Sequence, residues 1–241
     1  MKPYIVAMTG ASGAIYGVRL LRFFAESNIP VELVVSDTAK IVMKEELGHH
    51  VVPERFYHDN GPLGSGIQTG FPPETCGNDK NIGEVFGDDK KGELLLKLGI
   101  ENTAKIHLHD FKDFTAPIAS GSYPTEGMII IPCSMGTLGA IASGLSQNLI
   151  HRAADCTIKE GRKLVLVPRE TPLSAIHLEN MLKLARLGVR MVPPMPAFYG
   201  DQQKVEDLVD FVVGKVLDQF GIVHALYPRW VGKISGLETR D

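Results

Sequence analysis

Short apolar runs alternate with segments of helical periodicity along most of the chain. The runs have the aliphatic and β-branched composition of buried strands, and the segments between them repeat apolar residues every three to four positions. Strands are predicted at residues 4–9, 31–36, 128–132, 163–168 and 189–192. Helices are predicted at residues 14–27, 38–47, 137–143, 149–160, 171–187 and 205–220, with Thr171 as the N-cap of the fifth and Pro172 at its first position.

Apolar strands separated by helices are typical of a parallel sheet that is covered on both faces. We therefore predict an α/β fold, a single doubly wound Rossmann-like domain that spans residues 1–241. The stretch from about 48 to 91 is rich in Gly and Pro and lacks periodicity, which indicates a long excursion. A C-terminal arm, aromatic and basic, is expected from about residue 222.

Composition excludes several classes of partner. The 241 residues are 44% hydrophobic and 22% charged, and the net charge of −3 argues against binding to nucleic acid or to an anionic membrane. No apolar segment reaches the roughly 18–20 residues of a membrane helix. The three cysteines, Cys76, Cys133 and Cys156, form no CxxC motif and are expected to be reduced thiols. These features predict a cytoplasmic protein.

The first strand ends in TGASGAIYG, with Gly10, Gly13 and Gly17. In doubly wound sheets ligands bind outside the carboxyl ends of the strands. Glycines there permit a tight turn and let backbone N–H groups approach an anion at the helix N-terminus. The spacing is not GxGxxG, so the loop is also compatible with a plain strand-to-helix turn.

The second and third strand ends narrow the choice of ligand. Dinucleotide enzymes place an acidic residue near the end of the second strand, whereas this strand ends in Ser36 with Asp37 just beyond it. That difference favours a mononucleotide such as FMN. The third predicted strand ends in PCSMGTL, where Ser134 and Thr137 could contact a phosphate or the edge of a flavin. Ser134 could equally serve only as a helix N-cap.

Charged and polar residues follow the later strands. Arg169 and Glu170 end the run LVLVPRE, Tyr199 lies in PPMPAFYG, and Arg152 and Lys159 belong to the helix before LVLVP. Together they could hold a second anion, with a carboxylate for proton transfer, although each alone could be a solvated surface group. His177 is interpreted as a capping or buried residue. The histidines show no spacing for a catalytic metal, so no metal is predicted.

Several stretches together resemble the UbiX-type flavin prenyltransferases, whose members are also described as 3-octaprenyl-4-hydroxybenzoate or phenolic acid decarboxylase subunits. The resemblance covers nearly the whole chain except about residues 48–110 and the tail. The long PRE segment, in combination with PAFY, is its most specific part. The matching stretches are GASGAIYGVRLL, APIASGS, PCSMGTL, NLIHRAAD, LVLVPRETPLSAIHLENMLKLA, PPMPAFY and DLVDFVVGKVLDQFGI.

The resemblance implies a fold of the flavoprotein type and a metal-independent enzyme that joins a dimethylallyl group, taken from its monophosphate, to N5 and C6 of reduced FMN. The product, prenylated FMN, would serve a UbiD-type decarboxylase. The residues that the resemblance assigns to FMN are Gly10, Ala11, Ser12, Ser36, Ser134, Met135, Gly136, Thr137 and Arg169. Those assigned to the prenyl phosphate are Lys159, Tyr199 and Lys215, with Arg152 as a further candidate, and Glu170 would handle protons with help from Ser12 and Glu46.

One position departs from the family pattern. The last phosphate-binding residue is usually Arg and is Lys215 here, which keeps the charge but loses the bidentate fork. On an amphipathic helix Lys215 would face solvent, so a contact with ligand would cross a subunit interface of a homo-oligomer.

Three alternatives stay open at this stage. A phosphopantothenoylcysteine-type decarboxylase shares the FMN fold but carries an Asn-containing PxMNxxMW-like segment, where this chain has PPMPAFY. The protein could decarboxylate a phenolic acid directly. It could also be a non-catalytic FMN carrier subunit.

Overall fold

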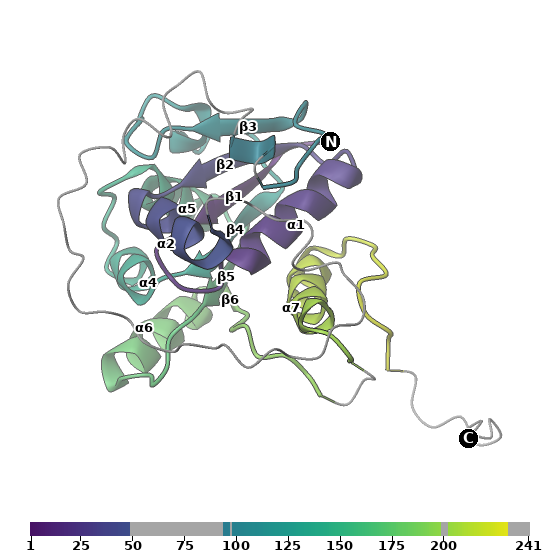
Figure 1. Ribbon diagram of the computed structural model, residues 1–241. Helices are drawn as coiled ribbons and strands as arrows, with labels where there is room; N and C mark the ends of the chain where they lie inside the picture. The colour runs from purple at the N-terminus through teal and green to yellow at the C-terminus, as the bar shows by residue number, and fades with distance from the viewer. Residues whose placement is uncertain (49–93, 97, 199–201, 231–241) are drawn as a thin grey trace, which may run out of the picture.

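The computed structural model describes residues 1–48, 94–96, 98–198 and 202–230. Six parallel strands form one sheet in the order β3-β2-β1-β4-β5-β6, with helices on both faces (Figure 1). This order confirms the predicted doubly wound α/β fold. The strands are β1 (Tyr4–Met8), β2 (Val31–Val35), β3 (Ile106–His109), β4 (Gly127–Cys133), β5 (Lys163–Pro168) and β6 (Arg190–Met191).

The predicted helices are also present, with ends that shift by a few residues. They are α1 (Ala14–Glu26), α2 (Asp37–Leu47), α4 (Met135–Ala142), α5 (Leu149–Lys159), α6 (Ala175–Arg186) and α7 (Val205–Phe220). Among the described elements, the edge strand β3 and a short 3₁₀ turn, η4 (Pro117–Ala119), were not predicted, nor were the helical residues 94–96. The predicted excursion at about 48–91 lies, beyond Gly48, outside the described residues, so the single-domain boundaries remain a prediction.

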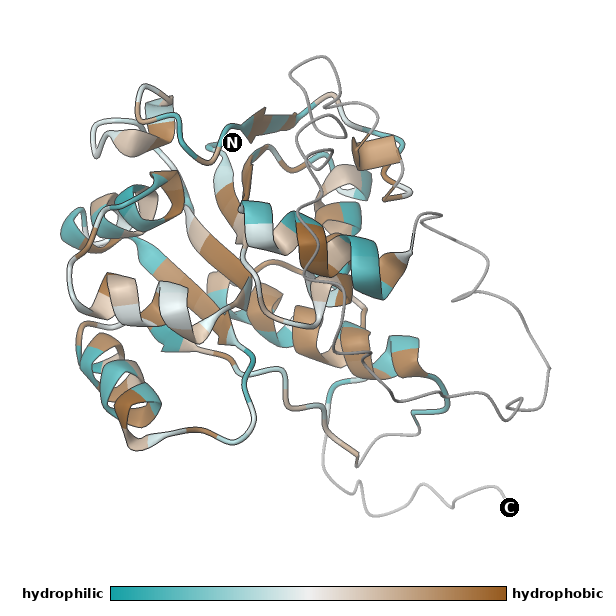
Figure 2. Cartoon of the chain, turned by 60° about the vertical axis from the view of Figure 1, so that its left-hand side comes forward, coloured by the Kyte–Doolittle hydropathy of each residue, from teal (hydrophilic) through white to brown (hydrophobic). Residues whose placement is uncertain are grey.

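Alternate residues of each central strand face opposite cores. In β1, Val6 and Met8 join the core formed with α1, α2 and α7, whereas Ile5 and Ala7 join the core formed with α4, α5 and α6. Both faces of the strands are therefore apolar, as the hydropathy colouring of the central sheet shows (Figure 2). Burial on both sides explains why these strands read as continuous apolar runs.

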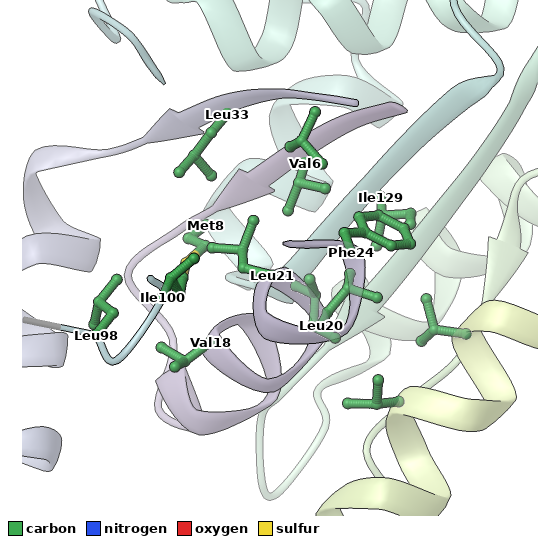
Figure 3. Packing of buried hydrophobic residues seen from close by; sticks show 14 of the residues in the cluster. Val6, Met8, Val18, Leu20, Leu21, Phe24, Leu33, Leu98, Ile100 and Ile129 are labelled. Atoms are coloured by element: carbon green, nitrogen blue, oxygen red, sulfur yellow. The ribbon is translucent and has the colours of Figure 1, made fainter. Parts of the chain in front are cut away.

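Helix α1 lies directly on the sheet. Its side chains Val18, Leu21 and Phe24 are at most 1% exposed and belong to the same core as the strand residues Val6 and Ile129 (Figure 3). A Cβ on Gly17 of this helix would lie 2.6 Å from the carbonyl oxygen of Ile131 in β4. Glycine at that position thus lets α1 approach the strands and fixes the place where the first loop leaves the sheet.

The predicted start of α6 is wrong. Its N-cap is Ser174, whose Oγ accepts a hydrogen bond of 3.2 Å from the backbone nitrogen of His177. The ring of His177 accepts a bond of 3.2 Å from the backbone nitrogen of Ser174 in return. This reciprocal pair satisfies two helix-end donors at once, whereas the hydroxyl of Thr171 donates instead to the carbonyl oxygen of Glu170. The capping interpretation of His177 is confirmed.

The sequence also led to expectations about the cysteines and about membrane-spanning helices. Cys133 and Cys156 are buried free thiols, and burial raises the pKa of Cys133 to about 12. Cys76 lies outside the described residues. Among the helices that the structure describes, none is long and apolar enough to span a bilayer.

Candidate active site at the carboxyl edge of the sheet

The residues that follow four neighbouring strands form one hydrogen-bonded row at the carboxyl edge. The backbone nitrogen of Ser36 donates to the carbonyl oxygen of Met8 at 3.0 Å. The backbone nitrogen of Thr9 donates to the carbonyl oxygen of Pro132 at 3.2 Å, and that of Arg169 to the carbonyl oxygen of Cys133 at 3.2 Å. The ends of β2, β1, β4 and β5 are thereby held in register. The structure therefore brings together the glycine loop, Ser36, the Ser134 turn and the PRE segment, as the parallel order requires.

The first loop is shaped by its glycines. A Cβ on Gly10 would lie 2.6 Å from Cβ of Thr38, so only glycine lets the loop reach the start of α2. Gly13 has a φ of +99° and is the residue before α1. Ser12, between them, is exposed at the edge, while Ala11 is buried. The loop thus presents the Ser12 side chain to a ligand and hides its neighbour.

The N-terminus of α1 already binds a carboxylate of the same chain. Glu46, in the last turn of α2, accepts hydrogen bonds from the backbone nitrogen of Gly13 at 2.9 Å and from that of Ala14 at 2.8 Å. The positive end of a helix favours such a negative group. At this helix end, where the sequence predicts a bound anion, the structure places the carboxylate of Glu46.

Ser36 and Ser134 are both helix N-caps. Oγ of Ser36 accepts a bond of 3.1 Å from the backbone nitrogen of Ala39, and Oγ of Ser134 accepts one of 3.2 Å from that of Thr137. The hydroxyl of Ser134 also donates to Oγ1 of Thr137 at 3.1 Å. The capping alternative for Ser134 is thus confirmed. The hydroxyl of Ser134 can still face a ligand because that residue is only partly buried, whereas Ser36 is 6% exposed.

Thr9 lies at the carboxyl edge of the sheet and was not among the residues predicted for the site. Its hydroxyl donates to the carbonyl oxygen of Pro132 at 3.0 Å and accepts from the backbone nitrogen of Ser134 at 2.7 Å, and the residue is 2% exposed. It therefore joins the end of β1 to the start of α4. The one clue in the sequence is a hydroxyl residue between an apolar strand and the glycine loop.

Arg169 and Glu170 extend the row beyond β5. Nε of Arg169 donates to the carbonyl oxygen of Ser12 at 3.3 Å, which links the PRE segment to the glycine loop. Burial raises the pKa of the nearby Tyr16, and the charge of Arg169 partly opposes that shift. Oε1 of Glu170 accepts a bond of 3.0 Å from the backbone nitrogen of Thr171, so the exposed carboxylate is held at the edge with Oε2 available.

Gly136, in the first turn of α4, which follows β4, faces open space. A Cβ built on Gly136 would meet nothing within 4 Å, and the residue is exposed. Met135 and Thr137, on either side of it, are partly buried. This opening lies next to the Ser134 turn, where the sequence predicts the flavin.

The predicted phosphate cations are not at this edge within one chain. Lys159 ends α5 just before β5 begins, and Lys215 lies near the end of α7, whose last residue, Phe220, lies against Gly127 at the start of β4. Both lysines therefore lie toward the amino edge, on opposite faces of the sheet. Nζ of Lys159 is 3.2 Å from Oε1 of Glu160.

Arg152 and Tyr199 are the other two residues predicted to bind the substrate. Nε of Arg152 donates to the carbonyl oxygen of Ala119 at 2.9 Å, and its Nη1 lies 2.8 Å from Oδ2 of Asp155. The guanidinium thus holds η4 against α5. Tyr199 lies outside the described residues. The described part of the chain contains no group of three or more His, Cys, Asp or Glu side chains that could hold a metal ion.

The strand order and the glycine, serine and arginine turns at one edge define an α/β flavoprotein. In agreement, the family described as Flavoprotein matches residues 1–217. A curated flavin prenyltransferase UbiX from Halalkalibacterium halodurans is 45% identical over 227 residues, which cover 94% of this chain and 92% of that protein. The chain belongs to the UbiX flavin prenyltransferases, a family of enzymes, which confirms the resemblance inferred from the sequence.

Two solved structures share both sequence and fold. A dodecameric FMN-dependent UbiX-like decarboxylase from Escherichia coli O157:H7 is 42% identical, has a TM-score of 0.71, and is matched over 95% of this chain and 100% of its own. AnUbiX (PadA1) in complex with FMN and dimethylallyl pyrophosphate is 36% identical, with a TM-score of 0.70 and coverage of 96% and 98%.

Proposed function

We propose that the protein transfers a dimethylallyl group from a dimethylallyl phosphate to N5 and C6 of reduced FMN, which makes prenylated FMN. The observation that carries the proposal is the row of strand ends at the carboxyl edge, where Arg169 binds the Ser12 carbonyl across 157 positions of sequence. Membership of the flavin prenyltransferases supports the same reaction.

FMN fits the residues present at this edge. A planar group would lie in the open space at Gly136, beside Ser134, Met135 and Thr137; a Cβ on Gly136 meets no atom within 4 Å, which supports this placement. The Gly10–Ser12 loop, the hydroxyl of Ser36 and the guanidinium of Arg169 supply donors for the ribityl chain and phosphate. Reduced FMN, as the acceptor substrate, supplies electron-rich N5 and C6 atoms to this site.

The chain's own groups then manage charge and protons. Breaking the allylic C–O bond builds negative charge on the leaving phosphate and cationic character on the prenyl carbons, and cationic side chains stabilise the former. Glu170 would take and return protons at Oε2, because its Oε1 is held by the Thr171 nitrogen. Ser12 would orient the acceptor, and Glu46 would assist by anchoring the loop that carries Ser12.

Lys159, Lys215 and Tyr199 are proposed to bind the prenyl phosphate. Because the two lysines lie toward the amino edge of their own chain, they would reach a carboxyl-edge site only in another copy. Arg152, committed to Ala119 and Asp155, would contribute by shaping that interface rather than by direct contact. The reaction therefore requires a homo-oligomer.

Exposed apolar side chains on one helix support such an assembly. Helix α6 buries only Leu184 of its twelve residues, and Ile176, Leu178 and Leu182 are 68%, 52% and 51% exposed. Single exposed apolar residues are ordinary, but three on one helix favour contact with another copy. The related Escherichia coli protein is described as dodecameric.

The donor and the destination of the product are also proposals. The monophosphate is the donor inferred from the family, whereas the related AnUbiX structure is described with the pyrophosphate, so both must be assayed. A UbiD-type decarboxylase would receive the prenylated FMN, in the cytoplasm.

The decisive experiment incubates purified protein anaerobically with reduced FMN and either phosphate, then records the flavin mass. The expected product is heavier by one C5H8 unit. Glu170→Gln should still bind FMN but lose turnover, whereas Glu26→Gln, at the exposed last residue of α1, should behave like the wild type. An unchanged flavin mass with carbon dioxide released from a phenolic acid would establish direct decarboxylation instead. Full activity of Glu170→Gln toward a partner decarboxylase would favour a carrier subunit.

A further inference from the structure

We propose that the C-terminal arm, defined as residues 222–230, keeps Lys215 available for the prenyl phosphate by engaging the neighbouring carboxylate of Asp218. Arg229 is the positioning residue in this arrangement. The inference rests on the proposed function, in which Lys215 binds the prenyl phosphate. It also concerns the position where the family usually has Arg and this chain has Lys.

The arm folds back along α7. Gly221, with a φ of +69°, ends the helix, and the ring of Tyr227 then lies 5.0 Å from that of Phe211, measured between centroids. A Cβ on Gly214 would lie 2.5 Å from Cε1 of Tyr227 and 2.7 Å from Cε1 of His224. Glycine in the middle of this helix therefore makes the groove that seats the arm.

The arm supplies several donors to one carboxylate. Oδ2 of Asp218 accepts from the hydroxyl of Tyr227 at 2.5 Å and from Nη1 of Arg229 at 2.8 Å. Oδ1 lies 2.7 Å from Nη2 of Arg229 and 3.2 Å from Nε2 of His224, whose side chain is fully buried. The hydrogen bond from Arg229 is the main reason why the pKa of Asp218 lies well below its usual range.

Lys215 is the outer member of this cluster. Its Nζ forms a long ion pair of 3.6 Å with Oδ2 of Asp218, beyond hydrogen-bond distance, and its side chain is 45% exposed. In the part of the chain that the structure describes, no hydrogen bond of this Nζ is found. Among the described residues, the ammonium group is thus held by this long ion pair alone, and its exposed side can meet an incoming anion.

The charge balance explains why the arm matters. Without Arg229, the ion pair of Lys215 and Asp218, at positions i and i+3 of one helix, would carry no net charge. With the arm in place, the guanidinium of Arg229 neutralises Asp218, and the charge of Lys215 remains. His224 adds no charge when neutral, and its Nδ1 accepts from the backbone nitrogen of Leu226, which leaves Nε2 to donate to Asp218.

The test compares steady-state kinetics of four variants in the full-length protein: Lys215→Gln, Arg229→Gln, Asp218→Asn and the double variant Asp218→Asn/Arg229→Gln. Arg229→Gln should raise KM for dimethylallyl monophosphate about fivefold, because Asp218 then pairs more closely with Lys215, with kcat and FMN affinity unchanged. In the double variant Lys215 no longer has a carboxylate to pair with, so KM should return to within about threefold of the wild type. Arg229→Lys should rescue part of the loss.

The outcomes separate the two proposals. If the arm served only to stabilise α7, the double variant would be at least as impaired as Arg229→Gln, and that result, or an unchanged KM in Arg229→Gln, would overturn the inference. A wild type that makes no prenylated flavin would overturn the proposed function and the inference together. Arg190→Gln, an exposed arginine on the edge strand β6, is the matched control and should keep the wild-type KM. Direct titration with the monophosphate checks the affinities in any variant too slow to assay.

Discussion

The carboxylate of Glu46, in the last turn of α2, lies 2.8 Å from the backbone nitrogen of Ala14, the first residue of α1. It also accepts from Gly13, which offers no side chain of its own as a cap. The two helices that flank β2 are therefore joined at the loop that carries Ser12. This contact makes the loop geometry depend on a residue more than thirty positions away.

Glu46→Gln should weaken that junction, because a neutral amide interacts less strongly with the positive end of α1. We expect a loss of about 0.5–1 kcal/mol in the free energy of unfolding, measured by urea denaturation, together with weaker FMN binding. Glu45→Gln, one position earlier on the exposed side of α2, should change neither quantity. Equal stability of the two variants would show that Glu46 does not anchor the loop.

Thr9→Val should destabilise the carboxyl edge more strongly. The valine retains the volume but removes the hydroxyl that bridges Pro132 and Ser134, and it leaves the backbone nitrogen of Ser134 without this acceptor. The expected cost is about 1–3 kcal/mol in the free energy of unfolding, with a higher Kd for FMN. Thr9→Ser keeps the hydroxyl and should retain most of both, so comparable losses in the two variants would contradict the role assigned to the hydrogen bonds.

The sequence predicted the local elements well and the long-range contacts poorly. Strands such as 163–168 were recognisable because burial on both faces demands continuous apolar residues. The edge strand β3 was missed because IHLH alternates polar and apolar residues and has a neighbour on one side only. The helix start at Ser174 was misplaced because Thr171 and Pro172 also suit an N-terminus, and only the reciprocal bond with His177 distinguishes them.

The same difference between local elements and long-range contacts applies to the site residues. Placing Ser36, Ser134 and Arg169 at one edge followed from parallel strand order alone. The bond between Arg169 and Ser12, and the seating of the arm on Gly214, depend on how distant segments meet, which spacing along the chain does not encode. For the same reason a family resemblance, rather than periodicity, was needed to assign a role to Lys215.

A buried cluster away from the site gives a prediction about pH. The hydroxyl of Tyr123 donates to Glu32 at 2.7 Å, and this bond to the carboxylate, with burial and the charge of Glu32, raises the pKa of Tyr123 from 10.0 to about 12. A folded-state pKa above the unfolded one means that the stabilisation is complete below pH 10 and is lost as the pH rises toward 12. His109 holds the other carboxylate oxygen at 2.5 Å.

Urea denaturation across that alkaline range tests the cluster. The wild type should lose stability relative to Tyr123→Phe between pH 10 and about 12, because the variant has no phenol to ionise there. Glu32→Gln should flatten the same interval, since the amide carries no charge that opposes ionisation of the phenol. Parallel curves for the wild type and Tyr123→Phe would show that Tyr123 ionises at its ordinary pKa.

A substitution at Gly136, which faces open space, is expected to raise stability and to lower FMN affinity. Gly136→Ala places a methyl group where the protein has no atom within 4 Å, and alanine is favoured over glycine in a helix by up to about 1 kcal/mol. The ligand-free protein should therefore unfold at a slightly higher urea concentration. If a flavin fills the space, the same methyl group meets the ligand, and the Kd for FMN should rise about tenfold or more.

Gly139→Ala is the matched control, one turn further along the same helix. Its added Cβ would lie 3.5 Å from Nδ2 of Asn180, an ordinary contact, and it faces α6 instead of the open edge. The stability gain should resemble that of Gly136→Ala, while FMN affinity stays at the wild-type value. Because both substitutions add the same methyl group to α4, a difference in FMN binding reports on which of the two positions the flavin approaches. Unchanged FMN affinity in Gly136→Ala would show that the flavin does not bind beside the Ser134 turn, and its site would then have to lie elsewhere on the sheet.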